Sequence, residues 1–175
     1  FIILFLDTSS SDNLNYDDQV FPENKLESLY KFFLDWLIKD NEVALIVKPK
    51  RLKVFQRLPN INSIIKKLIR TGRCHIVDDA LGAIPSHYSH ISDLVFAITA
   101  DCVPTSVLDC VINDNKKRAI FFDFQGSKNV EASLISWGKD RVIFEDLETL
   151  KKLLVNFKPN YNSDSLFGVW QKDYL

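Results

Sequence analysis

Short apolar runs alternate along this chain with longer segments in which apolar side chains recur at helical spacing. The short runs predict six strands, at residues 2–6, 43–47, 75–77, 94–98, 119–122 and 142–144. Most of these runs are apolar at consecutive positions, which is typical of strands covered by helices on both faces of a sheet. Helical periodicity occurs at residues 24–38, 57–70 and 147–154, and it predicts helices with one buried stripe each.

The order of these segments predicts the fold class. Strand and helix alternate with short connections, and this order favours a single parallel sheet with right-handed crossovers. We therefore expect an α/β protein with a Rossmann-like, doubly wound, mostly parallel six-stranded sheet over residues 1–155. The helical pattern fades after Asn156. Residues 156–175 are expected to form a carboxyl-terminal tail or strap toward a partner domain outside this sequence.

Two large aromatic side chains in this tail, Phe167 and Trp170, are the reason to expect a partner domain. They follow the polar stretch 160–164 and belong to an apolar cluster too short to build a layer of its own. Aromatic side chains often anchor contacts between partners. We expect both rings to be exposed on this chain or covered by residues outside it. The alternative is that both rings fold back on the domain's own helices.

Charge and composition exclude several classes of protein. The chain has 175 residues, with 22 basic and 23 acidic side chains, a net charge of −1 and no block of like charges. This balance argues against a nucleic-acid partner or a membrane-surface helix. The longest apolar run, residues 1–6, is far shorter than the ~20 residues of a bilayer-spanning helix, so no membrane span is expected. The chain begins with Phe1 and has no methionine, which indicates a piece of a longer protein.

The cysteines indicate a reducing compartment. Cys74, Cys102 and Cys110 form no C-x-x-C pair and have no histidine at zinc-finger spacing. An odd number of cysteines in a chain long enough to build a core predicts reduced, cytoplasmic thiols. We therefore expect no metal site, and nothing in the sequence predicts a cofactor.

Polar side chains follow most of the predicted strands. Ligands of open parallel sheets bind beyond the carboxyl ends of the strands, so residues just after each apolar run are candidates for a site. Ser9 and Ser10 follow the first strand, Lys48 ends the second, and Thr105 and Ser106 follow the fourth after a short loop. Hydroxyl groups and a cation at one edge suit phosphate oxygens. For the two serines the alternative is a flexible surface loop, and for Lys48 it is a solvated basic turn.

The segment from Pro104 to Asp109 is the sharpest of these candidates. Proline suits the first turn of a helix, and hydroxyl groups there can bind an anion together with free backbone amides. Asp109 comes four residues after Thr105, so its carboxylate could reach a ribose while the helix start holds the phosphate. The alternative interpretation is a capping box, with Ser106 as the cap and Asp109 at its third position.

Several motifs of nucleotide, hydrolytic and metal chemistry are absent. The chain has no Walker phosphate loop and no G-x-G-x-x-G dinucleotide fingerprint. It also lacks G-x-S-x-G and H-E-x-x-H, and the absence of D-x-D argues against a metal-bridged nucleotide sugar. Because the chain has only five glycines, a phosphate would have to be held by a helix start.

Two stretches resemble the donor-nucleotide half of glycosyltransferases with the GT-B fold. They are residues 92–99 continued by 105–109, and residues 117–123. In that family a strand of this kind leads to a hydroxyl-bearing or glycine-bearing helix start with an acidic residue one turn on. Residues 46–50 and 136–144 are similar to the family's second strand and last strand. The similarity is to the enzymes of capsule and lipopolysaccharide synthesis in particular and covers about residues 40–155.

The resemblance implies one half of a GT-B fold, the donor-binding half of a metal-independent glycosyltransferase. The implied ligand is a UDP- or CMP-linked sugar, and the implied partner is an amino-terminal domain that supplies the catalytic base, so this chain would be inactive alone. The family often has glutamate in place of Asp109 and His-Pro in place of Lys48-Pro49, which leaves the nucleotide and the sugar open. Two alternatives are a non-catalytic Rossmann-like module that binds a ligand or a protein, and a nucleotide-sugar epimerase on the same fold.

Overall fold

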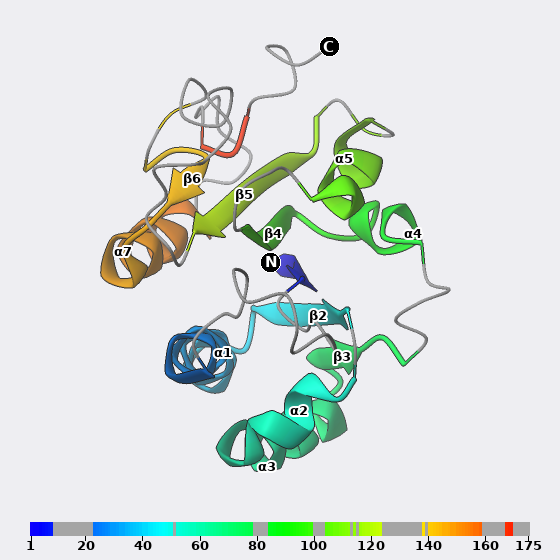
Figure 1. Cartoon of the computed structure of the whole chain (residues 1–175), viewed down its shortest axis with the longest axis vertical. Coiled ribbons are helices and arrows are strands. Elements are labelled where there is room, and N and C mark those ends of the chain that lie inside the picture. The colour runs from blue at the N-terminus through cyan, green and yellow to red at the C-terminus, as the bar shows by residue number, and fades with distance from the viewer. Residues whose placement is uncertain are drawn as a thin grey trace, which may run out of the picture.

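A single parallel sheet forms the centre of the molecule in the computed structural model (Figure 1). The structure describes residues 1–8, 23–50, 52–78, 84–99, 104–112, 114, 116–123, 138, 140–158 and 167–169. The strands are β1 (Ile2–Asp7), β2 (Ala44–Pro49), β3 (Cys74–Ile76), β4 (Leu94–Thr99), β5 (Arg118–Asp123) and β6 (Ile143–Phe144). They lie in the order β3-β2-β1-β4-β5-β6, and every neighbouring pair is parallel. The predicted doubly wound, Rossmann-like α/β fold is confirmed.

The helices begin where local sequence signals place them. They are α1 (Glu23–Lys39), α2 (Val54–Arg57), α3 (Pro59–Arg70), α4 (Ser86–Ser89), α5 (Thr105–Ile112) and α7 (Leu147–Phe157). The helix predicted at 57–70 begins at Pro59 instead, because the fixed φ of proline and its missing N–H suit a first turn. The carboxylate of Asp146 caps α7 by accepting the backbone N–H of Thr149 at 2.7 Å.

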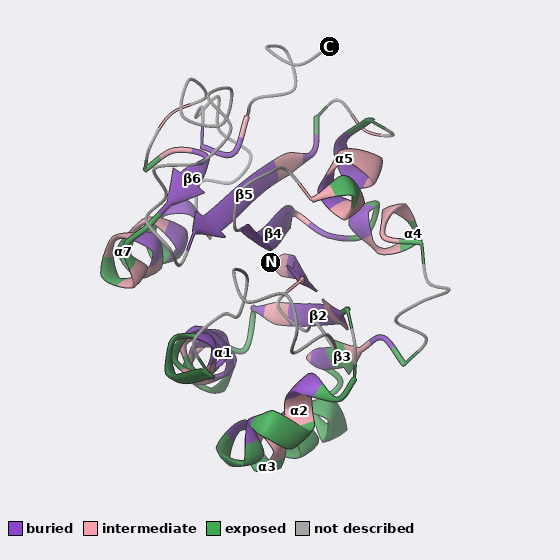
Figure 2. Ribbon diagram, in the orientation of Figure 1, coloured by how far each residue is buried: buried purple, intermediate pink, exposed green. Residues whose placement is uncertain are grey.

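Side-chain alternation gives the sheet two apolar faces. On one face, Ile3 and Phe5 of β1 pack with side chains of α1, α3 and α7. On the other face, Leu4 and Leu6 pack with α5 and with Tyr88 of α4. Figure 2 shows the strands buried while the helices expose one side each. Burial on both faces explains why the strands are apolar at consecutive positions.

Three aromatic rings hold α1 on the centre of the sheet. Phe33 of α1 lies 5.5 Å from Phe5 of β1 and 5.0 Å from Phe96 of β4, measured between ring centroids. The rings of Phe5 and Phe96 are themselves 5.1 Å apart. All three side chains are fully buried. This aromatic cluster fixes the helix over the junction between β1 and β4.

The carboxyl-terminal segment 167–169 packs on this domain. Phe167 is only 8% exposed, and its ring stacks on that of Phe157 in α7 at 4.5 Å and approaches that of Phe144 in β6 at 5.8 Å. Its carbonyl oxygen accepts a hydrogen bond from the Arg118 guanidinium at 2.6 Å. The prediction that Phe167 faces away from the domain is wrong, because the sheet and α7 offer the ring an apolar site. Trp170 lies outside the described residues.

Gly168 joins the beginnings of β5 and β6. Its N–H donates to the carbonyl of Arg141 at 2.9 Å, and its carbonyl accepts the N–H of Ala119 at 3.0 Å. The backbone of Gly168 has φ +69°, and a Cβ there would lie 3.2 Å from a methyl group of Ile120. Both the left-handed conformation and the close approach favour glycine at this position. The tail therefore takes part in the sheet edge.

Two of the three cysteines are buried free thiols. Burial raises the pKa of Cys74 to about 11 and that of Cys110 to about 12. Thiols that stay protonated at neutral pH are poor nucleophiles and poor metal ligands. Cys102 lies outside the described residues. Among the helices that the structure describes, none combines the length and the apolar character needed to cross a bilayer.

Candidate functional site

The strand order places a topological switch point between β1 and β4. From β1 the chain builds outward to β2 and β3, and then returns to the other side of β1 to build β4, β5 and β6. Connections that leave β1 and β4 therefore run in opposite directions across the sheet. In doubly wound folds this switch point opens a crevice at the carboxyl ends of the two strands, and ligands bind there. The candidate site is this carboxyl edge.

Buried polar side chains end three neighbouring strands, β1, β4 and β5. Asp7 at the end of β1 is 1% exposed, Thr99 at the end of β4 is 1% exposed, and Asp123 at the end of β5 is 0% exposed. The register pairs Thr99 with Asp123. The hydroxyl of Thr8 donates to the carbonyl of Ile98 at 2.7 Å and ties the ends of β1 and β4 together. Buried carboxylates keep hydrogen-bonding partners, so these residues organise the polar edge.

The candidates drawn from sequence omitted Asp7 and Thr99, although a signal for them existed. Each is the polar residue that closes an apolar strand. The apolar runs end at Leu6 and Ile98, so the apolar pattern alone does not include these two polar residues in the strands. The ladder extends each strand by one residue, because Asp7 pairs with Pro49 and Thr99 pairs with Asp123.

The start of α5 confirms a helix at the predicted phosphate site and removes the capping-box alternative. The carbonyl of Pro104 accepts the N–H groups of Val107 and Leu108, so the helix is already formed at Thr105. Ser106 therefore lies inside the first turn and does not cap it. Thr105 is exposed and Ser106 is partly exposed. The two hydroxyl-bearing residues stand at a helix start near the carboxyl ends of β4 and β5.

Asp109 contacts a neighbouring helix. One of its carboxylate oxygens accepts the backbone N–H of Ser86, the first residue of α4, at 3.0 Å. This bond joins α5 to α4 across 23 residues of sequence. It satisfies one backbone donor at the start of α4, where no intrahelical partner exists. The side chain is partly exposed, and its role toward a ribose stays a prediction.

Lys48 lies on the same side of the sheet as α5. In β2 its side chain lies on the same face of the sheet as that of Ile46, two residues earlier, and Ile46 belongs to the apolar cluster under α5. The positive charge of Lys48 is also near enough to act on the Cys110 thiol of that helix. Its side chain is partly buried. The structure thus brings Lys48 to the face that carries Thr105 and Ser106. The remaining candidates, Ser9 and Ser10, lie outside the described residues.

A buried hydrogen bond at the end of β1 was not foreseen from the sequence. The Tyr30 hydroxyl donates to the Asp7 carboxylate at 2.6 Å, and both side chains are buried. Burial first, and then the negative charge of Asp7, raises the pKa of Tyr30 well above its ordinary value of 10.0. The two residues are 23 positions apart. No local pattern could have paired them, since Tyr30 simply falls on the apolar stripe of α1.

The hydrogen bond between Tyr30 and Asp7 predicts that the folded protein loses stability at alkaline pH. Above pH 10.0 an unfolded Tyr30 releases its proton while the folded protein keeps it, so the free energy of unfolding falls as pH rises toward the raised pKa. Tyr30→Phe should remove this part of the slope, and it should cost about 1–3 kcal/mol at neutral pH because Asp7 loses a donor. Urea denaturation from pH 8 to 11 measures both effects.

Tyr88→Phe is the matched control for this prediction. Tyr88 is partly exposed and its ring stacks on His75 at 6.3 Å. Its substitution should leave the alkaline slope of the wild type unchanged. An identical slope in Tyr30→Phe and in the wild type would contradict the assignment of the alkaline effect to the pair.

A hollow opens at the carboxyl edge of the sheet, on the side that α1 covers. It has a volume of about 320 Å³ and lies between the first turns of α1 and the start of α7, with Phe122 of β5 in its lining. Lys25 and Ser28 line it from α1, and Glu145 and Asp146 line it from the turn before α7. The mixture of one cation, two carboxylates, one hydroxyl and the amide of Asn24 suits hydrogen bonds to an uncharged polar group rather than to a phosphate.

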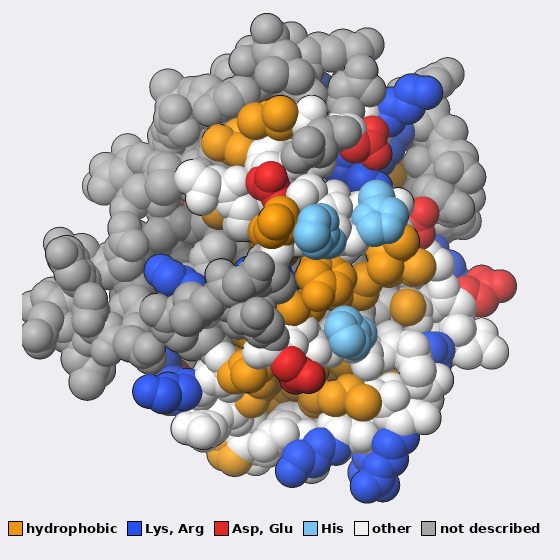
Figure 3. Space-filling view, turned by 90° about the vertical axis from the view of Figure 1, so that its right-hand side faces the viewer, with side chains coloured by type: hydrophobic (Ala, Val, Ile, Leu, Met, Phe, Trp, Pro, Cys, Tyr) orange, Lys and Arg blue, Asp and Glu red, His pale blue; other side chains and the backbone are white. Residues whose placement is uncertain are grey.

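Histidine side chains lie on the face that carries α4, α5 and the edge strand β3, next to apolar side chains (Figure 3). His75 stacks on Tyr88, and His87 belongs to α4. Within the described ranges, no group of three or more histidine, cysteine, aspartate or glutamate side chains is arranged to hold a metal ion. The histidines of this face therefore provide no argument for a metal centre.

The polar carboxyl edge of the sheet is thus the candidate binding site of this fold. It combines a topological switch point, a helix start with two hydroxyl-bearing residues, and a lysine on the same face. Comparison of the chain with protein families, with curated protein sequences and with solved structures found no match.

Proposed function

We propose that this chain binds a nucleotide sugar and is the donor-binding half of a metal-independent glycosyltransferase of surface polysaccharide synthesis. The strand order β3-β2-β1-β4-β5-β6 carries the proposal. This order is that of dinucleotide-binding Rossmann folds, which hold their ligands at the switch point. Part of the proposal is a second domain that supplies the catalytic base. A cytoplasmic location also belongs to the proposal, and the free thiols Cys74 and Cys110 fit it.

The start of α5 is the proposed phosphate site. A helix start offers unpaired N–H groups and the positive end of the helix dipole to an anion. Thr105 and Ser106 add hydroxyl donors in the first turn. The positive charge of Lys48, on the same face, would add to this field. The nucleotide would be UDP or CMP, with its ribose toward Asp109.

This arrangement suits the chemistry of sugar transfer. When the bond between the sugar and the phosphate breaks, negative charge develops on the departing nucleotide. Donors fixed around that phosphate stabilise the charge as it forms. Lys48 and the α5 start would supply this stabilisation without a metal ion. The reaction itself would need the second domain, so we expect this chain alone to bind the donor and to leave it intact.

Removing the two hydroxyls of the α5 start tests the proposed site. Thr105→Ala/Ser106→Ala should weaken the binding of UDP or CMP by about tenfold or more, since hydrogen bonds to a charged group contribute about 1.5–3 kcal/mol each. The free energy of unfolding should fall by about 1 kcal/mol or less, as for the loss of a cap. Isothermal titration calorimetry measures the affinity, and urea denaturation measures the stability.

Ser63→Ala is the matched control for this variant. Ser63 is an exposed residue of α3, and its hydroxyl donates to the carbonyl of Asn60 at 3.4 Å. Its loss should leave nucleotide affinity unchanged. Equal affinity in the double variant and in the wild type would show that the phosphate lies elsewhere. If neither UDP nor CMP binds the wild type, the proposal fails in favour of a Rossmann-like module for another ligand.

A further inference from the structure

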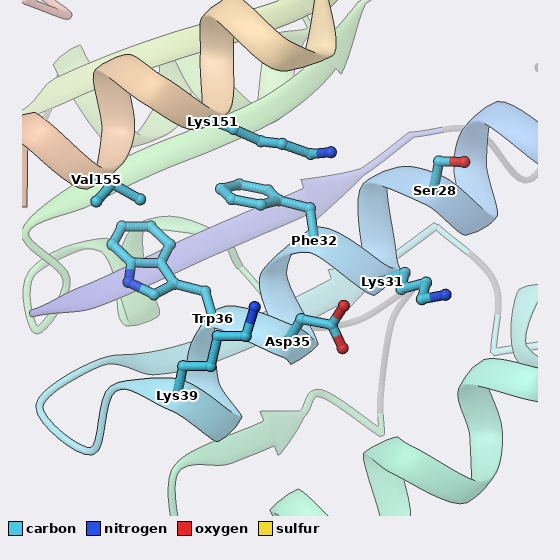
Figure 4. A pocket seen from close by; sticks show the side chains of 8 residues that line it. All are labelled: Ser28, Lys31, Phe32, Asp35, Trp36, Lys39, Lys151 and Val155. Atoms are coloured by element: carbon cyan, nitrogen blue, oxygen red, sulfur yellow. The ribbon is translucent and has the colours of Figure 1, made fainter.

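A groove runs along the outer seam between α1 and α7, on the side of the sheet opposite α5 (Figure 4). Its volume is about 460 Å³, which lies within the range of ligand pockets in proteins. Ser28 lines this groove and also the hollow at the carboxyl edge, so the two are neighbours. The residues of the groove play no part in the proposed nucleotide site.

Aromatic side chains line part of the groove. The rings of Phe32 and Trp36 stack with an interplanar angle of 26° and a centroid distance of 5.8 Å. Phe32 remains partly exposed, and Val155 of α7 is 48% exposed beside these rings. Figure 4 shows Trp36 pointing toward Val155, and Phe32 pointing toward the side chain of Lys151. Trp36 is only 7% exposed, so the apolar surface that the groove offers a ligand consists mainly of Phe32 and Val155.

The rest of the lining is charged and mainly positive. Lys31 and Lys39 come from α1 and Lys151 from α7, against the single acid Asp35. The lining thus has a charge of 3 − 1 = +2, whereas the whole chain has a charge of −1. Lys151 pairs with Glu148 at 2.6 Å and lies 5.8 Å from the Phe32 ring centre. In the part of the chain that the structure describes, neither Lys31 nor Lys39 forms an ion pair.

The mixture of groups selects the chemistry of the ligand. The lysines suit a carboxylate. The carboxylate of Asp35 favours a ligand that also carries groups able to donate hydrogen bonds to it. The Ser28 hydroxyl donates to the carbonyl of Asn24 at 2.8 Å, so its oxygen offers a ligand one further acceptor. The aromatic surface requires an apolar face in addition. An acidic sugar combines all three, because its ring has a face of C–H groups, a rim of hydroxyls and a carboxylate.

We propose that the α1–α7 groove binds an acidic sugar, with the C–H face of the ring on Phe32 and Val155, the carboxylate at Lys31 or Lys39, and a hydroxyl donating to Asp35. This site is separate from the nucleotide site at α5, on the other face of the sheet. It stands or falls independently of the proposed donor binding. Nucleotide affinity at α5 and sugar binding in the groove are measured with different ligands.

Trigalacturonate is the probe that tests this inference. Titrated into the isotope-labelled full chain, it should shift the NMR amide signals of residues 31–39 and 151–155 in a saturable way. Methyl-esterified trigalacturonate keeps the rings and the hydroxyls but lacks the charge, and it should bind at least about tenfold more weakly. Tricarballylate has three carboxylates and no ring, and it should also bind at least about tenfold more weakly.

Exposed lysines allow a matched pair of variants. Lys31→Gln/Lys39→Gln should weaken trigalacturonate binding by about tenfold or more. Lys66→Gln/Lys67→Gln makes the same change of charge on exposed positions of α3 and should leave the affinity unchanged. Unshifted amide signals elsewhere in the spectra show that each variant is folded. If both double variants weakened trigalacturonate binding equally, the effect would come from net charge alone, and the proposed site would be wrong.

Asp35→Ala separates a sugar site from a general anion site. Removing this carboxylate should weaken trigalacturonate binding, because a hydroxyl of the sugar loses its acceptor. If the groove only attracted anions, the same change would remove a repulsive charge and tighten binding. Tighter binding in Asp35→Ala, or the absence of saturable shifts in the wild type, overturns the inference.

Discussion

Phe33→Ala is expected to lower the free energy of unfolding by about 3–5 kcal/mol. The Phe33 side chain is fully buried and lies against Phe5 of β1 and Phe96 of β4. Its removal forfeits the burial of a large ring and leaves a cavity that close-packed neighbours cannot fill. The cavity would lie at the centre of the sheet, over the two strands that flank the switch point. Urea denaturation followed by circular dichroism measures the loss.

Ile38→Ala on the same helix is the control for this core substitution. Ile38 is 59% exposed, so its truncation should change the free energy of unfolding by about 0.5 kcal/mol or less. The two variants compare apolar truncations in one helix, with and without burial. If Phe33→Ala cost no more than Ile38→Ala, the packing of α1 on β1 and β4 would be wrong.

Phe167→Ala is expected to cost about 3–5 kcal/mol as well, although this residue lies near the end of the chain. The Phe167 ring stacks on Phe157 and approaches Phe144, and only 8% of the residue is exposed. Loss of the ring should also loosen the hydrogen bonds of Gly168 to Ala119 and Arg141. Denaturation with urea measures the change in free energy, and amide hydrogen exchange at Ala119 reports whether the segment has detached.

One result for Phe167→Ala would contradict the predicted loss of stability. A tail that only serves a partner would leave the stability of this chain unchanged when its aromatic ring is removed. Ile112→Ala provides the reference for that case, because Ile112 is 58% exposed on α5. Equal and small effects of the two substitutions would restore the interpretation of residues 167–169 as a strap toward another domain.

Most of the elements were predictable because their signals are local. The apolar stripe of α1 follows from the spacing of Leu26, Leu29, Phe33 and Leu37, all of which are buried. Strands buried on both faces produce runs such as residues 94–98 that are apolar at every position. The start of α5 was predicted within one residue because Pro104 precedes it. Errors remained at element ends, as at Asp7 and Thr99, where polar residues continue a ladder.

Only part of the candidate site was predictable. The rule that ligands lie beyond the carboxyl ends of strands pointed to Lys48, Thr105 and Ser106, and the fold brings these residues to one face of the sheet. The partner of Asp109 was not foreseen, because Ser86 lies 23 residues earlier in the chain. A carboxylate one turn into a helix looks the same in sequence whether it faces a ligand or a neighbouring helix.

The sequence by itself determined the alternation of strand and helix, and with it an α/β sheet, because burial patterns of periods 2 and 3.6 are written into neighbouring residues. The tertiary structure alone decided the strand order, which sets the switch point between β1 and β4. It also decided the pairing of Tyr30 with Asp7 and the return of Phe167 to α7. Such contacts join residues far apart in the chain, and many partners would satisfy a buried hydroxyl or an aromatic ring equally well. Which partner each one meets depends on how all the layers pack at once.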